Sequence, residues 1–137
     1  VNTYGGHPVS AAVAVRNIEI LQAEKLTERA ADTGAYLLDG LRSLMKKHKV
    51  VGDVRGKGLL IGVELVKDRA TKEPVDAQAI TAISDFCRDN GLLVGRAGGG
   101  RRYGNTITMS PPLVLTRAEC DRIVETMDRA LSAVKIG

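Results

Sequence analysis

The chain has 137 residues, a length that suits one domain with a hydrophobic core of its own. Hydrophobic residues make up 44% of it and charged residues 26%, which argues against disordered, coiled-coil and collagen-like classes. Aromatic residues make up only 3% and the net charge is a modest +4, so a nucleic-acid surface built on aromatic stacking is not expected.

Two helices are expected in the first third of the chain. The first begins at Pro8, because the missing N–H of proline would have no partner in a first helical turn, and it runs to about Glu24. It is apolar around much of its circumference, so we expect other protein to cover it. The second runs from about Leu26 to Lys47 and has an apolar face at spacings of three and four. Within it, Gly34 marks a bend or a close helix contact.

A strand and a third helix follow. Apolar and other residues alternate over 59–66, which predicts a strand with one face more apolar than the other. The charged stretch 67–74 is interpreted as a loop. Asp76 is placed to cap a helix that runs to Asn90, and Gly91 is placed to end that helix in a left-handed conformation.

The last third contains two more expected strands and a final helix. The strands are Leu92–Arg96 and Thr106–Met109, on either side of the basic, glycine-rich loop 97–105. Thr116 and Glu119 form a T-x-x-E capping box at the start of the helix. Its buried face is expected to comprise Cys120, Ile123, Val124, Met127, Leu131 and Val134. This order of elements predicts an α+β fold, a small and mostly antiparallel sheet covered by helices.

The cysteines and the chain start bear on cellular location. Cys87 and Cys120 lack a neighbouring cysteine or histidine at metal-ligand spacing, and both fall on apolar stripes, so they are interpreted as buried thiols of a reduced protein. No signal-peptide pattern opens the chain, and the longest apolar run, 58–66, is too short to span a bilayer. We therefore expect a cytoplasmic protein without metal, membrane or nucleic-acid partners.

The chemistry-bearing residues alone do not identify a function. His7 and His48 stand alone, and the glycine run 98–100 is not followed by the Lys-Ser/Thr of a P-loop. Thr3 lies in a loop that leads into the helix start at Pro8, which suits an anion, although a simple turn would have the same sequence. Arg96 would by itself be taken for a surface arginine at a hairpin.

Four segments together resemble class III aminotransferases, in the order of that family and with compatible spacing. They are N-T-Y-G-G-H-P-V at 2–9, V-R-G-K-G-L-L-I-G-V-E-L at 54–65, G-L-L-V-G-R at 91–96, and M-S-P-P-L at 109–113 with Thr116 after it. Each is weak alone, but they span nearly the whole chain. The resemblance implies that residues 1–137 are the C-terminal small domain of a fold type I pyridoxal phosphate (PLP) enzyme, beginning with an interdomain helix at about 8–25.

The resemblance also implies an activity. Such enzymes use PLP to transfer an amino group from an ω-amino acid or amine to a keto acid such as pyruvate. In the family the catalytic lysine precedes the segment matched by 2–9 and lies in a large domain, so we expect this chain to contain no catalytic residue and to be inactive alone. Lys57 occupies a variable position of its motif and is not interpreted as that lysine. The implied partners are the large domain and a second subunit, in a homodimer or a larger assembly.

Three residues carry over from the family's sites. Thr3 matches the threonine that hydrogen-bonds the PLP phosphate of the neighbouring subunit, and Asn2 can assist through its backbone. Arg96 matches the arginine that binds the substrate carboxylate and swings aside for other substrates; a guanidinium holds a carboxylate through two parallel hydrogen bonds. Arg101 and Arg102 compete with Arg96 for that role.

Some features leave alternatives open. The loop after Arg96 is longer than in many members and lacks their Gly-Asp step, which resembles the taurine- or ω-amino-acid–pyruvate branch more than the acetylornithine branch. PLP-dependent aminomutases and decarboxylases share the scaffold. A free-standing, non-catalytic interaction domain is the alternative outside enzymes. An in-frame domain with a PLP lysine upstream of Val1 would exclude that last alternative.

Overall fold

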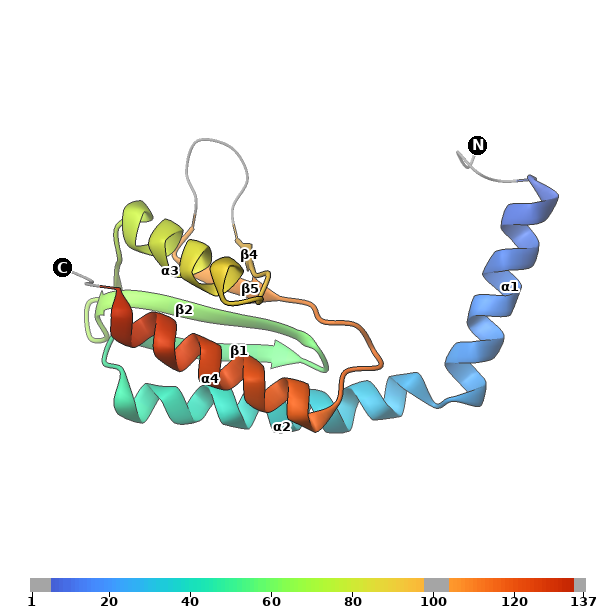
Figure 1. Cartoon of the computed structure of the whole chain (residues 1–137), viewed down its shortest axis with the longest axis horizontal. Coiled ribbons are helices and arrows are strands. Elements are labelled where there is room, and N and C mark those ends of the chain that lie inside the picture. Colours follow the sequence, from blue (N-terminus) through green and yellow to red (C-terminus); the bar gives the residue numbers. More distant parts are fainter. Residues whose placement is uncertain (1–5, 98–103, 135–137) are drawn as a thin grey trace.

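An antiparallel sheet and the helices packed against it form the body of the molecule. The computed structural model describes residues 6–97 and 104–134 (Figure 1). The helices are α1 (Pro8–Ala23), α2 (Leu26–Lys47), α3 (Ala77–Asp89) and α4 (Arg117–Ala133). The strands are β1 (Val51–Lys57), β2 (Leu60–Asp68), β3 (Glu73–Pro74), β4 (Gly95–Arg96) and β5 (Thr106–Met109). The predicted α+β class, with a mostly antiparallel sheet, is confirmed.

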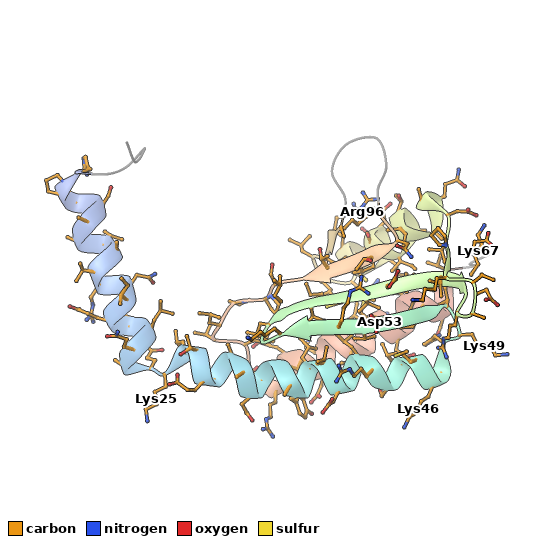
Figure 2. All side chains as sticks on the ribbon, turned by 180° about the vertical axis from the view of Figure 1, so that it is seen from behind. Lys25, Lys46, Lys49, Asp53, Lys67 and Arg96 are labelled. Atoms are coloured by element: carbon orange, nitrogen blue, oxygen red, sulfur yellow. The ribbon has the colours of Figure 1, made fainter. Side chains whose placement is uncertain are left out.

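The sheet has the strand order β1-β2-β5-β4, and β3 pairs with β2 near its end. Every pairing is antiparallel. Helices α3 and α4 lie over one face, and α2 runs beside β1 (Figure 1). Seen from behind, the strands lie in front of α3 and α4, so the other face of the sheet is not covered by those helices (Figure 2). The core between sheet and helices includes Leu37, Leu41, Val63, Leu65, Ile80, Ile83, Ile107 and Met127, each at most 1% exposed.

Helix α1 projects away from this core (Figure 1). It begins at Pro8 as predicted, and the Nδ1 atom of His7 accepts a hydrogen bond from the Ser10 amide at 3.4 Å. At Lys25 the backbone adopts a left-handed φ of 48°, and there the chain turns from α1 into α2 (Figure 2). No residue of α1 is buried, and four of its large apolar side chains are between 53% and 65% exposed: Val9, Val13, Val15 and Ile18.

Glycine at position 34 permits a close approach between α2 and the turn that joins β1 and β2. A Cβ atom added to Gly34 would lie 2.2 Å from the carbonyl oxygen of Gly58, in the turn between β1 and β2. Gly58 itself has a φ of 55°, in the left-handed region that favours glycine. The predicted close contact at Gly34 is thus confirmed, but its partner is the hairpin turn and not a helix.

Strand β1 was not anticipated as a strand. It pairs with β2 from Val51–Leu65 to Lys57–Leu60, and its register shifts between Val51 and Asp53. Because of this irregularity Val51 and Val54 are both buried although they are three residues apart. The strict alternation that marks a strand in sequence is therefore missing from this segment.

Three other local expectations need correction. Asp76 is at the N-cap of α3, but its side chain makes no capping hydrogen bond; its carboxylate lies 3.1 Å from the Lys67 ammonium. Of the predicted strand Leu92–Arg96, only Gly95 and Arg96 pair, as β4. The predicted loop 67–74 ends in the short strand β3. By contrast, Gly91 has the expected left-handed φ of 79°.

Specific polar contacts stabilise the start of α4 and the C-terminal end of α2. The Thr116–Glu119 capping box at the start of α4 is confirmed. At the C-terminal end of α2, the Arg69 guanidinium donates to the carbonyl oxygens of Met45 at 2.6 Å, His48 at 2.9 Å and Val51 at 3.0 Å. It thereby satisfies carbonyls that a helix C-terminus leaves without an intrahelical donor. Asp128 of α4 contacts the side chains of Lys47 and His48, each at 2.5 Å.

Both cysteines are buried, as predicted. Burial raises the pKa of the Cys87 thiol to about 11 and also raises that of Cys120. Within residues 6–97 and 104–134, no helix has the length and apolar character needed to cross a bilayer. The same ranges contain no cluster of three or more His, Cys, Asp or Glu residues that could bind a metal ion.

The contact at Gly34 gives a first prediction. Gly34→Ala should lower the free energy of unfolding by about 1–3 kcal/mol, because the new methyl group meets backbone that cannot rotate away. Chemical denaturation monitored by circular dichroism measures the change. Gly40→Ala on the same helix is the control, since its Cβ would meet only the Val124 side chain, at 2.8 Å. Equal effects of the two substitutions would contradict the prediction.

The Asp128 contacts give a pH-dependent prediction. Hydrogen bonds from His48 and then Lys47 hold the pKa of Asp128 below its usual range. The stabilisation is therefore fully present above the ordinary aspartate pKa of about 4 and is lost as the pH falls through the lower folded value. Asp128→Asn should destabilise the chain by about 1 kcal/mol at pH 5.5, and the difference should shrink below pH 4.

Urea unfolding of the unsubstituted chain and of Asp128→Asn from pH 5.5 to 2.5 measures the difference in their free energies of unfolding. Asp39→Asn is the matched control, because Asp39 is 78% exposed and lies 3.6 Å from its partner Arg42. A difference for Asp128→Asn that stays constant over the whole range would show that the pair does not act through its charge.

Candidate functional site

Arg96 is the last residue of strand β4. Of the three predicted site residues, it is the one that the structure describes. It pairs with Ile107 of β5, and the preceding Gly95 pairs with Thr108. Side chains of directly paired residues leave a sheet on the same face. Ile107 is completely buried, so Arg96 is directed to the face that the helices cover. There its Nη1 atom donates a hydrogen bond to Oγ1 of Thr81 on α3, at 2.8 Å.

Thr81 is itself fixed by a second hydrogen bond. Its hydroxyl donates to the carbonyl oxygen of Ala77, one turn earlier in α3, at 2.9 Å. The hydroxyl proton is thus used within the helix, and an oxygen lone pair faces the guanidinium. Sequence analysis did not identify Thr81, because nothing in the chain order brings the second turn of α3 next to the end of β4.

The backbone beside Arg96 is anchored. The amide of Ala97 donates to the carbonyl oxygen of Thr106 at 2.9 Å, and the amide of Gly104 donates to the carbonyl oxygen of Ala97 at 2.7 Å. The guanidinium therefore extends from a fixed backbone position, as expected for the end of a strand. Asn2, Thr3, Arg101 and Arg102 lie outside the described residues.

A hollow of about 360 Å³ lies beside β4 and is lined by Gly95 and Thr108 of the sheet and by Ile123 of α4. A Cβ atom at residue 95 would lie 2.5 Å from the Thr108 hydroxyl oxygen, so a larger residue there would require the Thr108 side chain to move. Leu93 also lines the hollow and is 84% exposed, an unusual state for a leucine next to a core. Pro111, in the predicted M-S-P-P-L segment, closes another side. Two of the family-like segments, 91–96 and 109–113, thus meet at one place.

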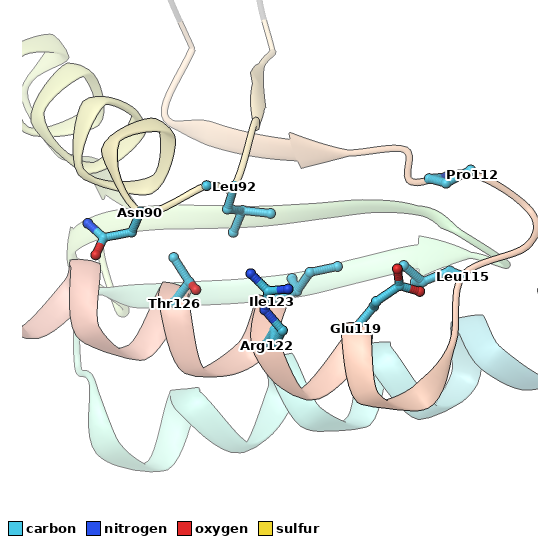
Figure 3. A pocket seen from close by; sticks show the side chains of 9 residues that line it. Asn90, Leu92, Pro112, Leu115, Glu119, Arg122, Ile123 and Thr126 are labelled. Atoms are coloured by element: carbon cyan, nitrogen blue, oxygen red, sulfur yellow. The ribbon is translucent and has the colours of Figure 1, made fainter.

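A second pocket, of about 220 Å³, lies between the end of α3 and α4 (Figure 3). Leu92, Leu115 and Ile123 supply apolar side chains to it. Its acidic residue, Glu119, already accepts hydrogen bonds from the Thr116 hydroxyl at 2.7 Å and the Thr116 amide at 2.8 Å, which lower the pKa of that carboxyl. The pocket does not include Arg96.

Two charged residues of the 54–65 segment, Arg55 and Glu64, pair with each other. Arg55 of β1 lies 2.7 Å from the carboxylate of Glu64 on β2 and 2.8 Å from that of Asp53. These contacts, with Asp53 first, hold the pKa of the Arg55 guanidinium above its ordinary value. Lys57 is exposed at the end of β1. This segment therefore shapes the hairpin.

The chain is similar to known proteins in both sequence and structure. The family model described as aminotransferase class-III matches residues 1–131. The taurine–pyruvate aminotransferase of Bilophila wadsworthia is 43% identical over 136 residues, which are 98% of this chain and 30% of that protein.

Two solved structures are also similar. An aminotransferase from Bacillus anthracis superposes with a TM-score of 0.91 and 42% identity, over 97% of this chain and 30% of that one. A PLP-bound amine transaminase from an uncultivated Pseudomonas species gives a TM-score of 0.87 and 41% identity, over 98% of this chain and 29% of that one.

The chain thus spans about 30% of the length of the relatives that it matches. The match nonetheless extends over nearly all of the chain itself, in sequence and in fold. The chain belongs to the class III aminotransferase family.

Proposed function

We propose that this chain is the C-terminal domain of a PLP-dependent transaminase that transfers an amino group from an ω-amino acid or amine to a keto acid such as pyruvate. The observation that carries the proposal is Arg96, a guanidinium at the anchored end of β4, in a chain of this family. The taurine–pyruvate relative supports both the donor class and the acceptor.

PLP is the cofactor that the family and the PLP-bound relative indicate. When bound, it supplies the electron sink that makes amino transfer possible, while the protein supplies orientation and charge. We assign Thr3, helped by the Asn2 backbone, to its phosphate. The described start of α1 is compatible with a nearby anion, because its first turn contains no acidic residue and a helix N-terminus carries partial positive charge.

Arg96 is assigned to the substrate carboxylate. A keto acid such as pyruvate brings a carboxylate to the site, whereas an amine donor brings none, so one site must accept both. A long side chain on a fixed backbone can pair with the carboxylate in one half-reaction and withdraw in the other. The role of this chain in the reaction is therefore binding and discrimination, and the catalytic lysine is assigned to a large domain outside residues 1–137.

The exposed apolar surface of α1 supports the proposal that further protein packs against this chain. Four large apolar side chains on one helix are more than half exposed, and extended apolar surface of this kind is typical of an interface. We assign it to the large domain and to a second subunit of a cytoplasmic homodimer. An aminomutase or decarboxylase on the same scaffold remains the alternative; the similar proteins named above are aminotransferases, which favours transamination.

The assignment of Arg96 is tested in the full-length enzyme. Arg96→Ala should raise KM for pyruvate far more than KM for an amine donor without a carboxylate. Loss of the two-hydrogen-bond contact should weaken keto-acid binding by roughly 2–5 kcal/mol. Steady-state kinetics of both half-reactions give the two constants. Arg101→Ala and Arg102→Ala are the controls, and a selective loss in either of them but not in Arg96→Ala would transfer the role to that residue.

The assignment of Thr3 is tested by cofactor retention. Thr3→Ala should weaken PLP binding by roughly 1.5–3 kcal/mol, because one hydrogen bond to a charged acceptor is lost. Dialysis followed by absorbance spectroscopy measures the PLP that remains. Thr3→Ser should retain the cofactor, and Thr27→Ala, which removes a hydroxyl that donates to Glu28, serves as the control. Unchanged retention in Thr3→Ala would indicate that the threonine only shapes a turn.

A further inference from the structure

We propose that Thr81 is a positioning residue that holds Arg96 in its withdrawn orientation and thereby sets the balance between carboxylate-bearing and carboxylate-free substrates. This inference rests on the proposed carboxylate-binding role of Arg96. It adds a second residue, on a different element, that acts through the guanidinium and does not touch the substrate.

The hydrogen bond between the two residues joins a mobile group to a fixed one. Arg96 has a long, flexible side chain, whereas Thr81 is β-branched and stands on the second turn of a regular helix. The threonine hydroxyl donates to the Ala77 carbonyl oxygen at 2.9 Å. This bond fixes the orientation of the hydroxyl oxygen, which accepts the hydrogen bond from the guanidinium at 2.8 Å. A preset acceptor of this kind selects one orientation of the arginine.

That orientation faces the helix layer of this domain. The register with the buried Ile107 directs Arg96 towards α3. A guanidinium held at Thr81 is thus turned into this domain, whereas the catalytic lysine is assigned to a large domain outside residues 1–137. We infer that binding a carboxylate requires the guanidinium to leave Thr81.

The contact is suited to reversible exchange. A hydroxyl is a neutral acceptor of a single hydrogen bond, whereas a carboxylate carries the opposite charge and accepts two parallel hydrogen bonds from a guanidinium. A substrate carboxylate can therefore displace Thr81, and the arginine can return when the carboxylate is gone. An aspartate or glutamate at position 81 would hold the guanidinium as strongly as the substrate does and would oppose the exchange.

The population of each orientation then sets the apparent affinity for each substrate class. Apparent affinity falls in proportion to the fraction of enzyme in the competent orientation. Removing the Thr81 contact should move Arg96 towards the carboxylate-binding orientation. KM for the keto acid should decrease and KM for a bulky amine should increase, so the two constants should change in opposite directions.

Thr81→Val in the full-length holoenzyme is the test, because it keeps the β-branched shape and removes the hydroxyl. We expect KM for pyruvate to fall and KM for a bulky amine such as 1-phenylethylamine to rise, each by roughly three- to tenfold, with little change in kcat. Thr81→Ser should restore both constants. Ser84→Ala is the matched control, since Ser84 makes the same bond to the residue one turn earlier, to Ile80 at 2.9 Å, on the same helix.

Each result decides between distinct explanations. If both KM values rise together, or if kcat alone falls, Thr81 has only a structural role and the inference is wrong. If pyruvate KM rises and amine KM falls, Thr81 holds the carboxylate-binding orientation and the assignment to the withdrawn orientation is wrong.

The double variant separates this inference from the proposed function. In an Arg96→Ala background, Thr81→Val should have no further effect on either KM. If Arg96→Ala raises pyruvate KM selectively but Thr81→Val changes nothing in the Arg96 enzyme, only the Thr81 inference fails. If Arg96→Ala is itself without selective effect, the proposed role of Arg96 fails and the Thr81 inference fails with it.

Discussion

Strand β2 hydrogen-bonds to β1 along one edge and to β5 along the other, and the position of the candidate site depends on this double pairing. Val63 illustrates it, since it is paired with Val54 on one side and Ile107 on the other, and it is 1% exposed. β5 in turn carries β4, and Arg96 is the last residue of β4. A change of register by one residue in β2–β5 would turn Ile107 out of the core and would separate Arg96 from Thr81.

The helix layer is tied to the same hairpin. Gly34 allows α2 to contact the β1–β2 turn, and Arg69, which follows β2, donates to carbonyl oxygens at the end of α2. α4 closes the other side of α2 through Asp128 and its two basic partners. The arginine at the end of β4 therefore stands on a support that is fixed at Gly34 and at the C-terminal end of its longest helix.

The sequence correctly predicted those features whose sequence pattern acts within a short stretch of chain. A proline at a helix start, a T-x-x-E pair and a glycine after a helix each act within one turn, and Pro8, the Thr116–Glu119 box and Gly91 occur as expected. Features that depend on tertiary contacts could not be predicted from the sequence. The irregular pairing near Val51 hid β1, and Lys67 drew the Asp76 carboxylate into an ion pair instead of a cap.

The candidate site shows the same division. Arg96 could be found because it belongs to a segment that resembles a family motif, and its strand-end position could be anticipated. Thr81 could not be found, because its contact with Arg96 spans 15 residues of chain and depends on how α3 packs against the sheet. Thr3 and Asn2 remain predictions.

The state of the two cysteines has a practical consequence for measuring motion in this domain. They are the complete set in the chain, and both thiols are buried, with that of Cys87 at a pKa of about 11. Alkylating reagents react with thiolates, and at neutral pH these two groups are shielded and protonated. A single cysteine introduced on the exposed face of α3 would therefore accept a fluorophore or spin label selectively, without removal of the native pair.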